Sequence, residues 1–371
     1  MKKYIWLSLL LFTALAISAC GDKTTDNTGD AFDRKPFLDA AATAYIIPAY
    51  QDLEIKVTAM DVAAQRFTAS PSVSSLTTLQ AAWDAAYLSW QAAQHFEFGP
   101  AETSNGTLLL ENIGKFPANI SKIESFIAQG DTSQINFNVD TRGFIGIDYL
   151  IFSQDGDANT VVARYTTETF AANRRGYLRN VIGDLKSKTS ATLSAWQNGY
   201  SATFTSNTGT DGGSGTSLFY NAFVASFENL KNLKMALPAG KRAGQTAAEP
   251  TKVEAYYSGR SVKFMKAHLI SIESLWLGRS LSGTDGIGFE EYLRTVDGGE
   301  QLIADTKAQL QRAKNALDAL PETVPFSQTI VQNFAPVDAA NTELQKQTRY
   351  FKGDMASLLG LTITYSSNDG D

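Results

Sequence analysis

The 371-residue sequence is poor in the side chains that build most metal and redox centres, with one cysteine, Cys20, and two histidines, His95 and His268. A single thiol excludes an internal disulfide, a zinc–thiolate site and an iron–sulfur cluster. The two histidines form no His-Glu-x-x-His zinc motif. We interpret each as a partly buried, hydrogen-bonded side chain, because Glu97 would diverge from His95 on a helix and His268 lies beside an apolar stripe.

The sequence also lacks an excess of basic residues and the glycine patterns of phosphate-binding loops. Its formal net charge of −6 argues against a nucleic-acid partner, because neutralising phosphates requires a basic face. Gly286-Ile287-Gly288 has no third glycine, and the run from Gly212 to Thr216 lacks the last glycine of a nucleophile elbow. The residues alone therefore predict no catalytic group.

The N-terminus has the pattern of an export signal. Lys2 and Lys3 precede an apolar run, Tyr4 to Ile17, that is too short for a membrane-spanning helix. The run ends in Ile17-Ser18-Ala19-Cys20, which looks like a lipobox. We predict a signal peptide over residues 1–19 and a lipid on Cys20 that holds the protein to a membrane; the alternative is an ordinary secretory signal. Because no Asp follows Cys20 directly, we expect the outer membrane of the cell envelope.

Apolar residues at spacings of three and four predict an all-α protein. The longest stripes run from Leu76 to Ala93, Tyr177 to Trp196, Val262 to Trp276, Leu310 to Leu320 and Val337 to Leu358. Polar residues 20–35 predict a flexible tether, and a Gly/Ser/Thr-rich loop is expected over residues 205–217. This loop would divide an N-terminal helical domain, 36–204, from a C-terminal helical bundle, 218–371.

Five segments, in order, resemble the imelysin family. They are residues 45–50 (Tyr-Ile-Ile-Pro-Ala-Tyr), the aromatic helix of residues 83–97 closing on Phe-Gly-Pro, residues 143–150 (Gly-Phe-Ile-Gly-Ile-Asp-Tyr-Leu), residues 257–261 (Tyr-Ser-Gly-Arg-Ser) and residues 359–365. The resemblance implies two packed helical bundles with a cleft between the domains. It also implies an envelope lipoprotein linked to iron uptake, from a family sometimes classed as metallopeptidases.

The signature of that family, Gly-x-His-x-x-Glu, aligns with Gly143, Ile145 and Asp148. A His and a Glu three residues apart share one helix face and can bind the same metal ion. Ile145 has no donor atom, and one carboxylate does not hold zinc, so these positions predict no metal site and no cofactor is required. A metal cation would need His95 or His268 in the cleft, or a hard cation held by Asp148 and Glu97.

Other polar residues are candidates for the cleft or for structural roles. Asp148 is either a pocket carboxylate or a helix-cap or ion-pair partner. Glu97, Ser258 and Ser261 could line the cleft, although Ser261 is also well placed to begin the helix that contains Val262 to Trp276. Gly143 is expected to serve a close approach of two backbones or a tight turn.

These observations together favour a non-catalytic binding component associated with iron or haem acquisition, with envelope iron-uptake proteins as partners. Two alternatives from other classes stay open. One is a metallopeptidase with a shifted metal site, which predicts bound zinc and loss of activity with chelator. The other is a purely structural envelope protein, which predicts no polar convergence around Asp148.

Overall fold

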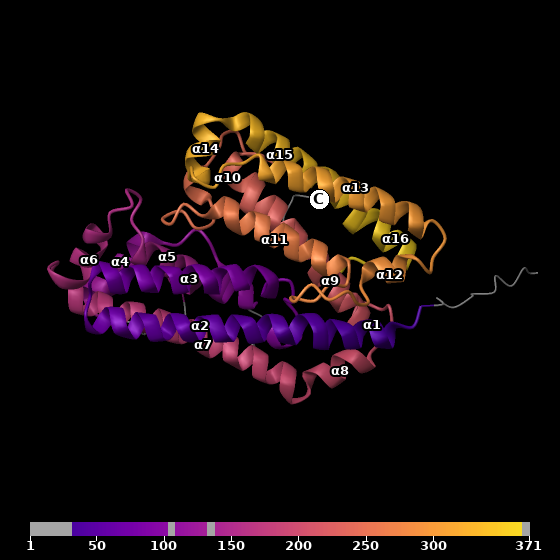
Figure 1. Ribbon diagram of the computed structural model, residues 1–371, viewed down its shortest axis with the longest axis horizontal. Coiled ribbons are helices and arrows are strands. Elements are labelled where there is room, and N and C mark those ends of the chain that lie inside the picture. Colours follow the sequence, from indigo (N-terminus) through magenta and orange to yellow (C-terminus); the bar gives the residue numbers. More distant parts are fainter. Residues whose placement is uncertain (1–31, 103–107, 132–137, 366–371) are drawn as a thin grey trace, which may run out of the picture. The chain divides into compact units, whose positions relative to one another are not determined.

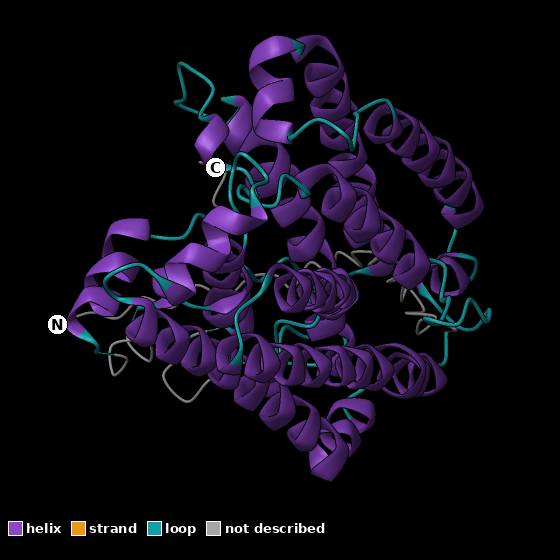
Figure 2. Ribbon diagram, turned by 60° about the vertical axis from the view of Figure 1, so that its left-hand side comes forward, coloured by secondary structure: helices purple, strands orange, loops and turns teal. Residues whose placement is uncertain are grey.

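A computed structural model describes residues 32–102, 108–131 and 138–365. The predicted signal peptide, Cys20 and residues 20–31 of the predicted tether lie outside these ranges. Within them the chain forms helices and two isolated β-bridges, with no strand (Figure 1, Figure 2). The all-α prediction is therefore confirmed.

Up to residue 228, the described part of the chain contains nine α-helices. They are α1 (Arg34–Ala40), α2 (Ile47–Ala69), α3 (Val73–Ala93), α4 (Ile120–Gln129), α5 (Gly143–Ile151), α6 (Ala158–Thr166), α7 (Ala171–Ala195) and α8 (Ser201–Ser206), followed after a loop by α9 (Gly215–Glu228). The described residues after 228 contain α10 (Leu237–Ala239), α11 (Ser261–Trp276), α12 (Phe289–Leu293), α13 (Gly299–Asp318), α14 (Phe326–Gln332), α15 (Phe334–Thr348) and α16 (Met355–Leu359). Several segments are π-helical, among them η1 (Ala41–Ile46), η3 (Leu110–Gly114), η7 (Asn229–Ala236) and η9 (Arg349–Asp354).

Local sequence explains where the principal helices begin and end. Ser72 and Ser75 bond reciprocally in a capping box that starts α3, which satisfies backbone N–H groups of the first turn. Helix α11 ends just before Gly278, which adopts the left-handed conformation with φ of +70°, and α16 ends at Gly360 with φ of +62°. These are the stops that the apolar stripes and glycines predict.

Two predicted irregular stretches are shorter than expected. The tether was expected to run to residue 35, but α1 begins at Arg34, because Asp33 accepts a hydrogen bond from the Lys35 N–H and caps the helix. The loop expected over residues 205–217 spans residues 207–214. Its far end is helical because the Ser214 hydroxyl accepts from the Ser217 N–H and so begins α9.

The chain from Phe32 onward forms one compact unit with one hydrophobic core. Helix α2 packs on α3 and α7, and α13 packs on α15, while α11 contacts both α3 and α13 (Figure 1). Aromatic rings pack where α3 meets α11, and the Tyr87 and Phe264 ring centroids lie 4.6 Å apart. Helix α11 thus connects the helices before and after the loop; the division into two domains stays a prediction.

The described helices also bear on membrane contact. None of them is both long enough and apolar enough to cross a bilayer.

Candidate functional site

The signature segment starts α5 against the backbone of η3. Gly143 has φ of +71°, and a Cβ atom built there would lie 2.5 Å from the carbonyl oxygen of Ile113. Only glycine accommodates both this conformation and this approach. The structure therefore agrees with the structural role expected for Gly143.

Asp148 lies at the other end of the signature and is fully buried. Its Oδ2 accepts from the Tyr257 N–H at 2.9 Å, and its Oδ1 accepts from the Ser258 N–H at 3.1 Å. Burial raises the pKa of Asp148 to about 7, while these hydrogen bonds and the charge of Arg260 oppose that rise. Asp148 thus ties α5 to the segment that leads into α11.

The residues of the signature do not fit a zinc ion. Ile145 is buried and has no donor atom, and both oxygens of Asp148 already accept backbone hydrogen bonds. A hydrolytic zinc site needs about three protein ligands and an open position. Across residues 32–102, 108–131 and 138–365, no group of three or more His, Cys, Asp or Glu side chains is placed to hold a metal.

Glu97 also binds backbone, on a different segment. Its Oε2 accepts from the Leu110 N–H at 3.0 Å, at the start of η3. Burial raises the pKa of the Glu97 carboxyl to about 8, against the effect of this hydrogen bond. Glu97 and Asp148 therefore position two separate segments, which argues against a hard cation shared between them.

A buried ion pair, which sequence reasoning missed, lies beside these segments. Lys234 and Glu254 have 3% and 1% of their side chains exposed, and the Lys234 Nζ is 2.8 Å from the Glu254 Oε1. The same Oε1 accepts from the Tyr87 hydroxyl, and the Lys234 Nζ also donates to the Gln91 Oε1 at 2.7 Å. Burial lowers the pKa of Lys234, and the charge of Glu254 opposes this effect.

The backbone around Glu254 is held in an unusual conformation. Ala255, the next residue, is buried and has a backbone φ of +54°, a conformation that residues other than glycine rarely adopt. The Ser261 hydroxyl donates to the Glu254 carbonyl, and Asp148 binds the N–H groups of Tyr257 and Ser258. Ser258 and Ser261 thus support the turn that presents Glu254.

A cavity of about 400 Å³ adjoins the buried pair. Its deeply buried lining residues are Gln94, Glu228, Lys234 and Glu254, whereas Glu111 and Lys115 are exposed. Its apolar lining comes mainly from η3 and η7 and the residues beside them, Leu108, Leu110, Phe116, Leu233 and Leu237. None of Ile145, Asp148, Ser258 and Ser261 lines this cavity; Asp148, Ser258 and Ser261 hold the segment next to it.

The two histidines meet at Ser226 on α9. The Ser226 Oγ lies 2.8 Å from the His95 Nδ1 and 2.8 Å from the His268 Nε2, and the His95 Nε2 lies 2.8 Å from the Ser271 Oγ. Both rings are buried, which agrees with the interpretation of each as a hydrogen-bonded side chain. A second cavity, of about 340 Å³, is lined by His95, Ser271 and Gln91 among others.

The direction of this chain of hydrogen bonds excludes His95 as a base for Ser271. The His268 Nδ1 is buried and has no partner, and a buried N–H without an acceptor is rarer than an acceptor without a donor. We therefore assign the proton to the His268 Nε2, which donates to the Ser226 Oγ. The Ser226 hydroxyl then donates to the His95 Nδ1, and the His95 Nε2–H donates to the Ser271 Oγ. The Ser271 hydroxyl donates in turn to the Gln91 or His268 carbonyl.

We expect the contribution of His95 to the free energy of unfolding to fall as pH decreases below 6.5. Burial, assisted by the charge of Lys234, lowers the pKa of His95 to about 3, so the unfolded chain binds a proton in this window that the folded chain excludes. For His95 this amounts to about 2 kcal/mol between pH 7.5 and pH 5.

Urea unfolding of the wild type and of a His95→Gln variant at both pH values measures this term. The raised pKa values of Asp148 and Glu97 act in the opposite direction, with stability lost as pH rises from about 4, but they contribute equally to both proteins. An equal pH dependence in the two proteins would contradict a neutral, buried His95.

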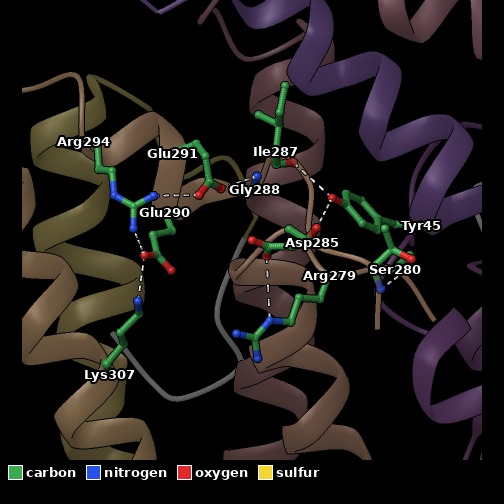
Figure 3. Close-up of polar contacts among 12 residues, drawn as sticks. Tyr45, Arg279, Ser280, Asp285, Ile287, Gly288, Glu290, Glu291, Arg294 and Lys307 are labelled. Atoms are coloured by element: carbon green, nitrogen blue, oxygen red, sulfur yellow. Dashed lines mark hydrogen bonds and ion pairs between the residues drawn. The ribbon is translucent and has the colours of Figure 1, made fainter. Parts of the chain in front are cut away.

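Tyr45, at the edge of the second cavity, anchors the loop between α11 and α12. Its hydroxyl lies within hydrogen-bond distance of the Gly278 and Ile287 carbonyls, as Figure 3 shows for Ile287. Burial and the charge of Glu291 raise the pKa of Tyr45 to about 12, so the phenol keeps its proton as a donor. Tyr45 belongs to the first of the five segments that resemble the imelysin family.

The sequence signal for the missed residues is weak but present. Lys234 lies between Leu233 and Met235 in η7, and Glu254 lies between Val253 and Ala255. A charged residue between two apolar residues in the sequence does not by itself predict burial, because a buried charge also needs a partner of opposite charge. The partner of Lys234 lies twenty residues away, beyond a turn, and periodicity does not reveal it.

Comparison with known proteins agrees with this architecture. The family model of imelysin matches residues 46–351. The fold is similar to that of a protein described as an iron-regulated protein A precursor from Parabacteroides distasonis ATCC 8503, with a TM-score of 0.72, 19% identity, and coverage of 87% of this chain and 94% of that one. It is also similar to an imelysin-like protein from Psychrobacter arcticum 273-4, with a TM-score of 0.70, 17% identity, and coverage of 90% and 97%.

No curated protein sequence matches the chain significantly. The family match nevertheless extends from the end of η1 into η9 and includes the signature segment. This chain belongs to the imelysin family.

Proposed function

We propose that this protein is a cell-envelope lipoprotein that binds a ligand in its cleft without hydrolysing it, as a component of iron or haem acquisition. The proposal rests on the hydrogen bonds of Asp148. Both of its carboxylate oxygens accept backbone N–H groups, and Ile145 occupies the histidine position of the signature. Polar side chains converge instead on the cavity beside Lys234 and Glu254.

The association with iron is supported by the family and by one structural neighbour. That neighbour is described as an iron-regulated protein A precursor. A precursor is processed, which is consistent with export, and the lipobox-like Ile17-Ser18-Ala19-Cys20 supports attachment to the envelope, with the outer membrane as the proposed site. Envelope iron-uptake proteins are the proposed partners.

The proposal predicts that the purified protein carries no stoichiometric metal. The mature protein would be purified in detergent from metal-replete cells, beside Asp148→Ala and the control Asp318→Ala, which removes an exposed carboxylate on α13. Elemental mass spectrometry is expected to give metal well below one equivalent in all three, and casein cleavage is expected to be absent with and without chelator. Circular dichroism confirms that each variant is folded.

Metal that is stoichiometric in the wild type and lost only in Asp148→Ala would contradict this proposal and support a metallopeptidase with a shifted site. The link to iron has its own readout, which is growth of the host without the gene under iron limitation. Slower growth that the wild-type gene restores is expected, and growth equal to that of the parent strain would favour a purely structural envelope protein.

A further inference from the structure

Two of the carboxylates that line the 400 Å³ cavity each have one oxygen without a hydrogen-bond partner. Glu228, the last residue of α9, and Glu254 have 4% and 1% of their surface exposed. The Glu254 Oε1 accepts from both Lys234 and Tyr87, yet its Oε2 is buried and has no hydrogen-bond partner. The Glu228 Oε1 accepts from the Lys352 Nζ at 3.0 Å, and its Oε2 likewise has no partner.

An unpartnered, buried carboxylate oxygen carries a free-energy cost. Buried polar groups in folded proteins are hydrogen-bonded in the great majority of cases, and an exception calls for a physical reason. Rotation about the last side-chain bond of glutamate is soft, so a carboxylate that lines a cavity can adjust its free oxygen to a ligand there. A ligand that enters the cavity with N–H donors would satisfy both oxygens.

The rest of the lining restricts what such a ligand is. Leucine and phenylalanine side chains from residues 108–116 and 233–237 favour a short apolar stem. A cavity of about 400 Å³ is at the small end of the range for small-molecule sites. The segments that carry these residues include η3 and η7, and π-helical turns are frequent at functional sites.

The carboxylates do not suit a metal ion or an anion. Each already binds an ammonium group through one oxygen, Lys234 for Glu254 and Lys352 for Glu228, so the two offer only two free oxygens, fewer than the about six or more that a hard metal ion takes. Within the part of the chain that the structure describes, no third acidic or histidine ligand joins them. An anion would face two further acceptor oxygens, so like charges would oppose it.

We infer that this cavity binds the ammonium or guanidinium end of a small organic cation with a short apolar stem, and that Glu228 and Glu254 accept its N–H donors. The inference rests on the proposed function, because it names the class of ligand that the proposed function leaves open. Hydrogen bonds between charged groups are short and strong, and two carboxylates on one cation distinguish it from a neutral molecule of equal size.

Isothermal titration of the mature protein in detergent with agmatine tests this inference. Agmatine joins a guanidinium and an ammonium through a short methylene chain, and butyrate serves as an anion with a similar stem. We expect agmatine to bind with a Kd of about 1 mM or tighter, and butyrate not to bind. Glu228→Gln and Glu254→Gln are each expected to weaken agmatine binding at least about tenfold.

Glu273→Gln is the matched control. Glu273 also pairs with a lysine, Lys314, but lies outside the cavity, so agmatine binding is expected to stay at the wild-type value. Because Glu254→Gln disturbs the buried pair with Lys234, its folding is checked by circular dichroism, and Glu228→Gln tests the inference independently.

Absence of agmatine binding to the wild-type protein would overturn the inference, as would equal binding by Glu228→Gln and the wild type. Binding of Ca²⁺ alone that Glu228→Gln abolishes would also overturn it, in favour of a cation site. These results leave the metal-content test of the proposed function unaffected, since that test depends on Asp148. The two can therefore fail separately.

Discussion

Replacement of Lys234 by methionine is expected to lower the free energy of unfolding by about 3–5 kcal/mol. Methionine fills a similar volume but leaves Glu254, 1% exposed, without the ammonium group 2.8 Å from its Oε1. Only the Tyr87 hydroxyl and low-dielectric surroundings would then remain around the charge. Urea unfolding followed by circular dichroism at pH 7 measures the change.

A second variant separates the lost pairing from lost packing. In Lys234→Met/Glu254→Gln no charge is left buried, so a substantial part of the stability is expected to return. Lys346→Met provides the matched control, because Lys346 pairs with Glu343 while 55% of its side chain is exposed. That pair is expected to contribute about 0–1 kcal/mol. An equal, small effect of Lys234→Met and Lys346→Met would show that burial does not set the strength of the Lys234 pair.

Replacement of Gly143 by alanine is the second change with a large expected effect, a loss of about 2–5 kcal/mol. The new Cβ would lie 2.5 Å from the Ile113 carbonyl oxygen, which is backbone and cannot rotate away. The φ of +71° adds strain for any residue with a side chain. The start of α5 and η3, which lines the cavity, would have to move apart.

Gly183→Ala tests the same substitution where neither reason applies. Gly183 lies inside α7, and nothing lies within 4 Å of the Cβ that alanine would add. Alanine there is expected to stabilise the helix by about 0.5–1 kcal/mol. Thermal unfolding of both variants gives the comparison. A Gly143→Ala protein as stable as the wild type would mean that α5 and η3 do not approach this closely.

Much of the fold was predictable from the sequence because helix formation depends on local pattern. The stripe from Val262 to Trp276 and its stop at Gly278 are properties of a short segment, and the structure has α11 over Ser261–Trp276. The ordered segments that resemble the imelysin family are likewise properties of the sequence. The family match over residues 46–351 confirms the resemblance to the family, and the fifth segment, residues 359–365, lies beyond that match.

The candidate site was only partly predictable. The sequence placed Asp148, Ser258 and Ser261 among the polar residues of interest, but it left the role of Asp148 open between a pocket carboxylate and a structural partner. The structure gives it two backbone N–H partners about 110 residues further along the chain. No periodic pattern encodes that contact, because it exists only when α5 packs beside the segment that precedes α11.

The sequence by itself therefore determined the helical class, the long apolar stripes and their glycine stops, the scarcity of metal-binding side chains and the absence of a donor atom at Ile145. Tertiary structure alone decided that Lys234 and Glu254 are buried together, that Glu228 and Glu254 line one cavity, and that His95 and His268 share Ser226. The reason is physical. Helix propensity and amphipathic spacing act over a few turns, whereas the burial of a charge and the choice of its partner depend on which distant segments exclude water around it.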